Sequence, residues 1–429
     1  MGPNTNDRNL MKALAENGMD IARFNFSHGD YEEQKSRLDM LKSIRDELDL
    51  PIAALLDTKG PEIRTKTYKD GKIEIVEGQE FTLTTRDIEG DNTIVSITYE
   101  GLPHDVQPGT RILIDDGLVA FEVLKIVDGT DIICKALNGG PLSNRKSINV
   151  PGIKLNMKFV SDKDREDIEF GLSQDIDFIA ASFTRSAQDV RDIKAILKAH
   201  GKEDVEIICK IENMEGVNNI QEILDEANGV MVARGDLGVE VPFEELPEIQ
   251  KSIIKTCISR GKRVVTATQM LESMAKNPRP TRAEVSDVAN AVYDGTDAVM
   301  LSGETAQGKY PVEALKMMVH IVESTEQHLD YKEMLEKAGA HRMRNASSAL
   351  AYATVTTARN LKAACIITPT VSGATARVVS KFKPKTEIIG ISPNEDTLRR
   401  MQIYWGVRPY CSFRGYAVRN SFYQCKFYR

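Results

Sequence analysis

The sequence predicts an α/β fold: a (β/α)8 TIM barrel that carries an inserted small all-β domain and is followed by a C-terminal α/β domain. Three observations lead to this prediction. Short β-branched runs alternate with charged amphipathic stretches over most of the chain, which is typical of parallel βα units. The rhythm stops between residues 61 and 151, where the turn signals Asp70-Gly71, Asp116-Gly117 and Asp128-Gly129 separate short alternating runs. It resumes after about residue 343.

Seven candidate strands belong to the barrel, one fewer than the eight that close such a fold. We expect them at 20–26, 52–57, 178–183, 206–211, 229–233, 263–267 and 298–301. The catalytic barrel domain is therefore placed at 1–60 and 152–335, and the inserted domain, a β-barrel lid, at 61–151. In a C-terminal domain at 343–409 we expect helices at 347–361 and from about 373, and strands at 364–367 and 387–391. Residues 410–429 contain many aromatic side chains and no acid, and we interpret them as an aberrant tail.

The composition restricts the functional classes. Lys and Arg total 56 against 63 Asp and Glu, and the basic residues are dispersed, so we expect no nucleic-acid partner. The sequence has neither a signal-like start nor an apolar run near the roughly 18 residues of a membrane span, so we expect no membrane contact. Six Cys without paired spacing fit a reducing cytoplasm.

Polar side chains follow several candidate strands at a spacing of two, so that each set shares one face. Active sites of this fold lie at the carboxyl ends of the strands. Any single set could be a surface ion pair or a strand-end cap, but five in succession favour a polar site. The sets are Arg23, Asn25 and Ser27; Asp57 and Lys59; Lys210 and Glu212; Thr266 and Thr268; Ser302 and Glu304.

Lys210, Glu212 and Asp236 form the strongest element, because they place two carboxylates and a lysine at the ends of consecutive strands. Two hard oxygen ligands suit Mg2+ or Mn2+, which complete their coordination with water and substrate oxygens. The absence of a nearby His or Cys cluster argues against zinc. The alternative is that both acids are helix N-caps. Lys210 could stabilise a transferring phosphoryl group or an enolate, with a Schiff base as the rival chemistry.

Two further segments could hold anions. Gly303 to Tyr310 nearly matches a nucleotide-binding P-loop, but Tyr310 replaces the required Ser or Thr, so we discount it. The segment 368–375 links a strand to a helix through hydroxyl side chains and free backbone N–H groups. It could be a second ligand site, and ordinary helix capping explains it equally well.

Six segments together resemble the pyruvate kinase family: ARFNFSHG (22–29), LLDTKGPEIRT (55–65), CKIEN (209–213), MVARGDLGVE (231–240), TATQMLESM (266–274) and MLSGETAQGKYP (300–311). The resemblance covers roughly residues 2–408, in the correct order and over all seven strands. It implies transfer of the phosphoryl group of phosphoenolpyruvate to ADP, giving pyruvate and ATP in the last step of glycolysis. It also implies that Mg2+ (or Mn2+) and K+ are the cofactors and that the complete protein is a homotetramer.

The resemblance also implies roles for individual residues. The catalytic residues would be Lys210, Arg23, Thr268, Ser302 and Glu304, and the substrate would be bound by Arg23, Gly235, Asp236 and Thr268. Glu212 and Asp236 would hold Mg2+, and Asn25, Ser27, Asp57 and Thr58 would hold K+. Arg64 and Lys146 would contact the nucleotide phosphates. Thr368, Thr370, Ser372, Gly373 and Thr375 would bind a phosphorylated effector, whose identity the sequence does not indicate.

The chain departs from the family pattern at both ends. Only Gly2-Pro3 remains of the family's first strand, so we expect the first barrel strand to be missing. The resemblance also stops near Arg408, so we expect the end of the C-terminal domain to be absent. Two alternatives follow: a catalytically inactive truncated remnant that binds ligands or intact subunits, and another metal-dependent phosphoenolpyruvate or enolate enzyme. The second alternative leaves Arg64 and Lys146 without a role.

Overall fold

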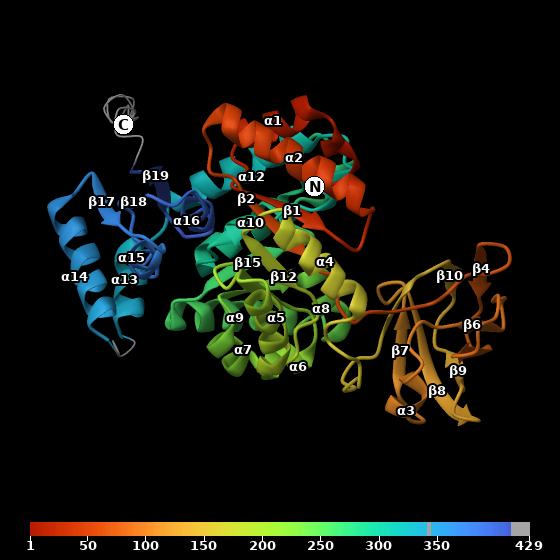
Figure 1. Ribbon diagram of the computed structural model, residues 1–429. Helices are drawn as coiled ribbons and strands as arrows, with labels where there is room; N and C mark the ends of the chain where they lie inside the picture. Colours follow the sequence, from red (N-terminus) through yellow and green to blue (C-terminus); the bar gives the residue numbers. More distant parts are fainter. Residues whose placement is uncertain (341–344, 413–429) are drawn as a thin grey trace.

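The computed structural model describes residues 1–340 and 345–412 of the 429-residue chain. Three bodies lie side by side in Figure 1. A curled sheet with its helices occupies the centre, an inserted β-rich body lies on the right, and a small α/β body lies on the left.

The central sheet contains seven parallel strands in the spatial order β1-β2-β12-β13-β14-β15-β16. They are β1 (Ile21–Asn25), β2 (Ala53–Asp57), β12 (Phe178–Ala181), β13 (Glu206–Ile211), β14 (Gly229–Ala233), β15 (Arg263–Ala267) and β16 (Ala298–Val299). All seven lie within the predicted ranges. Within the described part of the chain, the edge strands β1 and β16 pair with no further strand, so the sheet is an open barrel. The α/β class is confirmed.

Helices connect these strands and cover the outer face of the sheet (Figure 1). Ser161, Ser186 and Thr281 begin α4, α5 and α10 with capping boxes, in which the cap side chain and a side chain three residues later satisfy backbone N–H groups reciprocally. The helices around the barrel are η1 (Pro3–Asn6), α1 (Arg8–Glu16), α2 (Tyr31–Leu48), α4 (Asp162–Ser173), α5 (Ala187–Ala199), α6 (Met214–Asn218), α7 (Ile220–Glu226), α8 (Arg234–Glu240), α9 (Leu246–Arg260), η2 (Glu272–Ala275), α10 (Arg282–Asp294), α11 (Gly303–Ala306) and α12 (Pro311–Glu326).

The inserted body consists of strands and one short helix, α3 (Leu102–Asp105). Its main sheet has the order β3-β11-β7-β8-β9-β5-β6, and β10 pairs with β4. Asp128 and Gly129 both have positive φ in the turn between β8 and β9, as the hairpin signal there requires. The strands are β3 (Ile63–Arg64), β4 (Lys72–Ile75), β5 (Glu80–Thr84), β6 (Ile94–Ser96), β7 (Arg111–Ile114), β8 (Val119–Val127), β9 (Asp131–Ala136), β10 (Gly140–Ser143) and β11 (Ser147–Asn149).

The C-terminal body is built on a parallel three-stranded sheet in the order β17-β18-β19. Its elements are α13 (Tyr331–Ala340), α14 (Ala346–Leu361), β17 (Cys365–Pro369), α15 (Ala374–Ser380), β18 (Glu387–Ser392), α16 (Glu395–Met401) and β19 (Val407–Cys411). The sequence did not predict β19. This strand runs two residues into the segment that we interpreted as an aberrant tail, because Tyr410 pairs with Ile391 and Cys411 with Ser392. The rest of that segment, 413–429, lies outside the described residues.

The barrel interior and the C-terminal body share one apolar core. Leu55, Phe178 and Met231 from the sheet belong to the same buried cluster as Phe382 and Tyr404. The C-terminal body is therefore packed directly against the barrel. Among the residues that the structure covers, no helix has the length and apolarity needed to cross a membrane.

Candidate active site

Four polar side chains meet at the carboxyl ends of β2, β12 and β13. Lys210 Nζ lies 3.2 Å from Asp57 Oδ1 and 2.8 Å from Ser182 Oγ. Ser182 Oγ is in turn 3.0 Å from Asp57 Oδ1 and 2.6 Å from the Thr58 carbonyl oxygen. Arg23 on β1 donates from Nε to Asp57 Oδ2 at 2.5 Å. The residues predicted at three separate strand ends therefore belong to one network.

Charge complementarity keeps this network ionised although it is buried. Burial alone would lower the pKa of Lys210, but Asp57 and Glu212 outweigh burial and raise it. Burial alone would likewise raise the pKa of Asp57, and the charges of Arg23 and Lys210 lower it instead. These neighbours hold Lys210 in its charged form, which favours an electrostatic role over Schiff-base formation.

Glu212 is fully buried, and its two oxygens differ. Oε2 accepts a hydrogen bond from the Phe183 backbone N–H at 2.6 Å. Oε1 forms an ion pair with Lys210 Nζ at 2.9 Å, but this contact lacks the alignment of a hydrogen bond, and Oε1 accepts none from the described residues. Burial, together with the charge of Asp236, raises the pKa of Glu212 to about 8, although Lys210 opposes the shift. An unsatisfied buried oxygen is unfavourable unless a further group binds to it.

Asp236 supplies the second carboxylate of the predicted metal site. It lies in the first turn of α8, is half-buried, and receives no side-chain hydrogen bond or ion pair from any described residue. Its charge affects the pKa values of both Glu212 and Lys210, so the three groups are close enough to interact. In the described ranges, no three His, Cys, Asp or Glu side chains cluster as a metal site. Glu212 and Asp236 offer two carboxylates, and Mg2+ commonly takes only one or two from a protein, with substrate oxygens and water completing its coordination.

Thr268 follows β15 and contacts the start of α8. Its Oγ1 accepts a hydrogen bond from the Gly235 backbone N–H at 2.8 Å and donates to the Ala267 carbonyl at 2.6 Å. Thr268 and Gln269 both have positive φ, of 66° and 54°, which is costly for residues with a side chain. Such strain is often found at functional sites. The structure thus brings the predicted residues Gly235 and Thr268 together.

Glu304 holds the loop after β16 in place. It is buried, and its oxygens accept hydrogen bonds from the backbone N–H groups of Ser302, at 2.7 Å, and Leu271, at 3.2 Å. The Ser302 hydroxyl is buried and makes no hydrogen bond to any residue that the structure describes. Glu304 therefore orients the segment that carries Ser302, whose hydroxyl remains available to a bound group.

The four residues predicted to bind K+ lie around the carboxyl ends of β1 and β2. Asn25 and Asp57 are partners in the register of these two strands. Asn25 Oδ1 accepts a hydrogen bond from the Ser27 backbone N–H at 3.0 Å, and Thr58 Oγ1 accepts one from Ser182 N at 3.1 Å. This set supplies oxygen donors only, which suits a hard monovalent cation.

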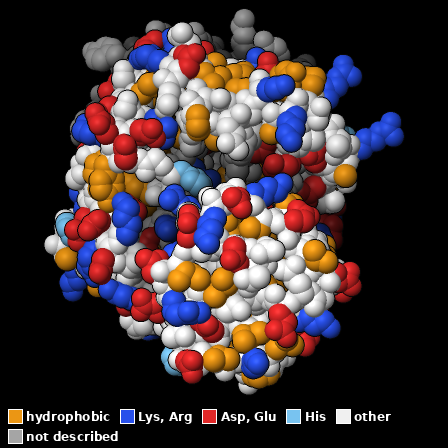
Figure 2. Space-filling model, turned by 90° about the vertical axis from the view of Figure 1, so that its right-hand side faces the viewer, with side chains coloured by type: hydrophobic (Ala, Val, Ile, Leu, Met, Phe, Trp, Pro, Cys, Tyr) orange, Lys and Arg blue, Asp and Glu red, His pale blue; other side chains and the backbone are white. Residues whose placement is uncertain are grey.

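A cavity of about 440 Å3 lies between the inserted body and the barrel. Arg64 and Asp236 both line it. Figure 2 shows the molecule from this side, with a hollow between two lobes and charged side chains along its edges. Arg64 pairs with Glu62 through Nε at 2.7 Å and Nη2 at 2.9 Å, and Lys146 pairs with Asp115 at 2.9 Å. Lys146 does not belong to the cavity lining that contains Arg64.

The hydroxyl-rich segment of the C-terminal body divides into two parts. Thr368 is buried in β17, where its hydroxyl donates to the Ile389 carbonyl at 3.1 Å. Thr370, Ser372, Gly373 and Thr375 lie on the following loop and in the first turn of α15. Gly373 caps this helix with a φ of 79° and no side-chain hydrogen bond. Thr368 is therefore already satisfied by the sheet, whereas Ser372 and Thr375 are exposed, Thr370 is half-buried and Gly373 is buried.

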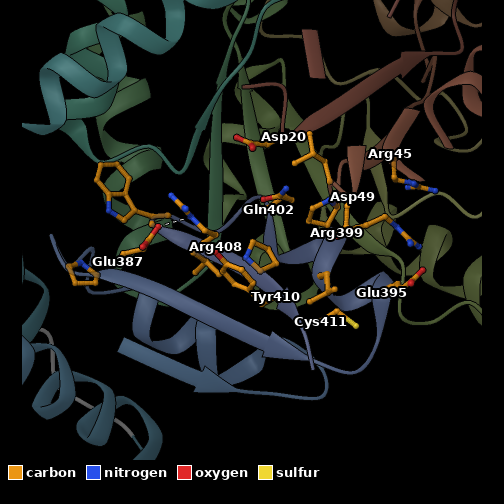
Figure 3. Close-up of a pocket in the computed structure, with 18 of the residues that line it drawn as sticks. Asp20, Arg45, Asp49, Glu387, Glu395, Arg399, Gln402, Arg408, Tyr410 and Cys411 are labelled. Atoms are coloured by element: carbon orange, nitrogen blue, oxygen red, sulfur yellow. Dashed lines mark ion pairs between the residues drawn. The ribbon is translucent and has the colours of Figure 1, made fainter. Parts of the chain in front are cut away.

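Sequence reasoning missed Ser182 and Phe183, which contact Lys210 and Glu212 directly. Neither forms a spaced polar pair, so the pattern that identified the other residues could not detect them. Phe183 has a φ of 55°, which turns its N–H toward Glu212. A larger cavity, of about 790 Å3, lies elsewhere, between the barrel and the C-terminal body, and is lined by Asp20, Arg399 and Tyr410, among others (Figure 3).

These features define an α/β barrel enzyme whose site combines a buried lysine, clustered carboxylates and hydroxyl groups at the strand ends. Family models give a more specific result. The model "Pyruvate kinase, barrel domain" matches residues 1–315, and "Pyruvate kinase, alpha/beta domain" matches residues 348–422.

Known proteins support the same assignment. The pyruvate kinase of Geobacillus stearothermophilus is 50% identical over 408 residues, which cover 95% of this chain and 70% of the relative. That of Clostridium acetobutylicum is 45% identical over 96% of this chain and 87% of the relative. A crystal structure of a pyruvate kinase from Cryptosporidium parvum superimposes with a TM-score of 0.94 at 39% identity, covering 99% of this chain and 89% of that one. The chain belongs to the pyruvate kinase family and is a phosphotransferase.

Proposed function

We propose that this chain transfers the phosphoryl group of phosphoenolpyruvate to ADP, giving pyruvate and ATP, through the residues at the carboxyl ends of the barrel strands. The observation that carries the proposal is the position of Lys210. Its charged ammonium group lies among Asp57, Ser182 and Glu212, beside the unsatisfied Glu212 Oε1. Phosphoryl transfer depends mainly on positioning and charge stabilisation, and a fixed cation next to open oxygen ligands can supply both.

Lys210 and the side chains around it have different roles in the proposed reaction. Lys210 stabilises the negative charge on the phosphoryl group during transfer, and Arg23 binds the phosphate from the neighbouring strand. The Gly235 N–H and the Thr268 hydroxyl, which donate to Thr268 Oγ1 and to the Ala267 carbonyl in the structure, would exchange these acceptors for the substrate carboxylate. Thr268, Ser302 and Glu304 belong to the polar network through which the enolate product takes up its proton. Ser302 Oγ is suited to this role because it is buried and makes no hydrogen bond in the resting structure.

Glu212 and Asp236 are the residues that would hold Mg2+ or Mn2+. The cation would neutralise charge on substrate oxygens when bound. Two observations support this assignment: Glu212 Oε1 makes no hydrogen bond beside its ion pair with Lys210, and the Asp236 carboxylate has no partner among the described residues. Asn25, Ser27, Asp57 and Thr58 would hold K+. Asp57 is shared with Arg23 and Lys210, so the monovalent site and the transfer site are adjacent.

The inserted body would act as a lid over the cavity that contains Arg64. Arg64 and Lys146 would contact the nucleotide phosphates, each exchanging a carboxylate partner for a phosphate oxygen. The proposed domains are 1–60 and 152–335 for the barrel, 61–151 for the lid, and 343–411 for the C-terminal domain, extended from 409 to include all of β19. The open edges of β1 and β16 are consistent with a barrel short of one strand.

The remaining proposals concern an effector site, the cellular location and the oligomeric state. Thr370, Ser372, Gly373 and Thr375, with Thr368 at the base of the loop, would bind a phosphorylated effector. The protein would be cytoplasmic, and its complete form would assemble as a homotetramer. No comparison favours the catalytically inactive alternative.

A coupled assay of pyruvate formation with Mg2+ and K+ tests the proposed function. The unmodified chain should turn over phosphoenolpyruvate, and Glu212→Gln or Asp236→Asn should reduce turnover at least 100-fold, about 3 kcal/mol of transition-state stabilisation. Both substitutions should also weaken Mn2+ binding measured by electron paramagnetic resonance. Glu226→Gln, which changes a surface carboxylate paired with Arg191 and Lys194, is the matched control and should keep full activity. Full activity of both site variants would disprove the metal assignment.

A further inference from the structure

A small cavity lies where the amino-terminal ends of the barrel strands meet the C-terminal body. Lys262 and Arg263, at the start of β15, line one side of it. Arg377, Lys381 and Lys383, in or just after α15, line the other. Five cationic side chains from two parts of the fold therefore surround one space. This space is at the opposite end of the strands from the candidate active site, so its interpretation does not depend on the proposed function.

Only part of this positive charge is balanced. Lys383 Nζ pairs with Asp297 Oδ1 at 2.5 Å, and Arg263 pairs with Glu206 through Nη2. Lys262 Nζ donates to the Ala227 carbonyl at 2.6 Å, which is a neutral acceptor. Asp297 and Glu206, the two carboxylates that face the cluster, thus each form an ion pair with one cation, Lys383 and Arg263 respectively.

Among the described residues, the other donors of the cluster have no hydrogen-bond acceptor, although the Arg263 guanidinium lies over the ring of Tyr404, 5.0 Å from its centre. Arg263 is 3% exposed, and its Nε and Nη1 atoms are buried without a hydrogen-bond partner. Arg377 and Lys381 are half-buried, and no described carboxylate pairs with either of them. Buried guanidinium N–H groups normally donate hydrogen bonds to protein or water acceptors. The contacts of Arg263 within the protein leave two such groups without an acceptor, so an acceptor from outside the chain is expected here.

We propose that this cavity is a binding site for a small inorganic anion. The space measures about 20 Å3, enough for a group the size of one water molecule. A halide ion fits this space, as does a single oxygen of a phosphate group whose other oxygens face the cavity mouth. The anion would accept hydrogen bonds from Arg263 and face Arg377 and Lys381. Because these residues come from both sides of the junction, a bound anion would hold the C-terminal body against the barrel.

The positions of the cations in their helices explain the cluster only in part. Arg377 and Lys381 lie near the carboxyl end of α15, where positive side chains are generally favourable. Arg263 begins strand β15, so this helix preference does not explain why its Nε and Nη1 groups are buried without acceptors. Burial, reinforced by repulsion from Arg263 and Arg377, also lowers the pKa of Lys262 to about 8. A bound anion would relieve this repulsion.

Thermal unfolding of the full chain at constant ionic strength tests the site. Sodium gluconate would be replaced stepwise by sodium bromide in one series and by sodium phosphate in another. We expect a saturable rise in Tm of about 2 °C with at least one of the two anions. A rise with bromide assigns a halide, and a rise with phosphate alone assigns an oxyanion. No saturable rise in either series would overturn the proposal.

Two controls separate this site from others. Arg377→Gln/Lys381→Gln should lose the rise in Tm, whereas Lys316→Gln, which removes an exposed charge on α12, should keep it. A rise that persists in the double variant would contradict the proposal. If the double variant does not fold, anomalous diffraction from bromide-soaked crystals of the unmodified chain decides. A bromide peak beside Arg263 Nε or Nη1 is expected if the bromide series shows the rise, and its absence in that case would refute the site.

Discussion

Ser182 links three parts of the candidate active site through one hydroxyl group. The hydroxyl accepts a hydrogen bond from Lys210 Nζ at 2.8 Å and can donate its single proton either to Thr58 O or to Asp57 Oδ1. Because Ser182 is 1% exposed, water cannot replace these bonds. We therefore expect Ser182 to be a positioning residue, which fixes the ammonium group of Lys210.

Replacing Ser182 tests this role. Ser182→Ala should lower kcat by about 10- to 100-fold, because a hydrogen bond to a charged group contributes about 1.5–3 kcal/mol. The KM for phosphoenolpyruvate should change less than twofold, since Arg23, Gly235 and Thr268 would still bind the substrate. Steady-state kinetics measures both values. Ser173→Ala, which removes an exposed hydroxyl bonded to the Phe170 carbonyl, is the control and should keep both. A large rise in KM with kcat unchanged would contradict the positioning role.

Most residues of the candidate site could be predicted because they occur as polar pairs after apolar runs. Asp57 is the last residue of β2, Lys210 lies near the end of β13, and Glu212 directly follows β13. Ser182 and Phe183 could not be predicted, since their roles depend on contacts with residues 28 or more positions away. The ion pairs of Arg64 with Glu62 and of Lys146 with Asp115 were not predicted either, because nothing in the sequence identified these two acids as partners.

At the level of elements, strands were predicted most accurately where a continuous apolar run marks them in the sequence. The barrel strands β2, β12 and β14 are buried on both faces, so each reads as a continuous apolar run. The strand β19 (Val-Arg-Pro-Tyr-Cys) has no such run, and Pro409 argues against an interior strand. It forms because the edge of β18 that does not face β17 is open to pairing, and this depends on tertiary structure, not on the local sequence of β19.

The contribution of β19 can be measured with two shortened chains. A chain that ends at residue 409 should melt about 2–4 °C below one that ends at residue 412. The shorter chain loses the pairing of Tyr410 and Cys411 with β18, as well as the hydrogen bond from Ser412 N to Ser392 O at 3.0 Å. Differential scanning calorimetry of the two chains gives the comparison, in which residues 413–429 are absent from both. Equal melting temperatures would show that these residues do not stabilise the sheet.

At the level of the whole molecule, buried ion pairs join the C-terminal body to the barrel. Arg399 on α16 donates from Nε to Asp177 Oδ1 at 2.7 Å, and Asp177 Oδ2 accepts a hydrogen bond from Ala54 N at 2.8 Å. Arg399 also lines the large cavity at this junction (Figure 3). Burial raises the pKa of Asp177, and Arg399 only partly opposes this shift. Arg399 is the main support of the ionised carboxylate, with smaller contributions from the Ala54 N–H and the charge of Arg45.

Removing Arg399 should destabilise the protein in a pH-dependent way. Arg399→Gln leaves a buried carboxylate without its cation, at a cost of about 3–5 kcal/mol near neutral pH. The folded variant binds a proton at Asp177 more tightly than the unfolded chain does, because its folded pKa is raised. Its stability deficit should therefore shrink as the pH falls from about 7 to about 5. Urea unfolding followed by tryptophan fluorescence can measure the deficit, because Trp405 lies in the C-terminal body near this junction.

Arg400→Gln is the matched control for this experiment. Arg400 is the next residue in α16, and its pair with Asp204 also joins the two bodies, at 2.8 Å. Asp204, however, is half exposed, so water can solvate its carboxylate when the arginine is removed. The loss should be at most about 1 kcal/mol and nearly independent of pH over the same range. Equal losses in the two variants, or a deficit for Arg399→Gln that does not change with pH, would show that burial of Asp177 does not govern the docking of the C-terminal body.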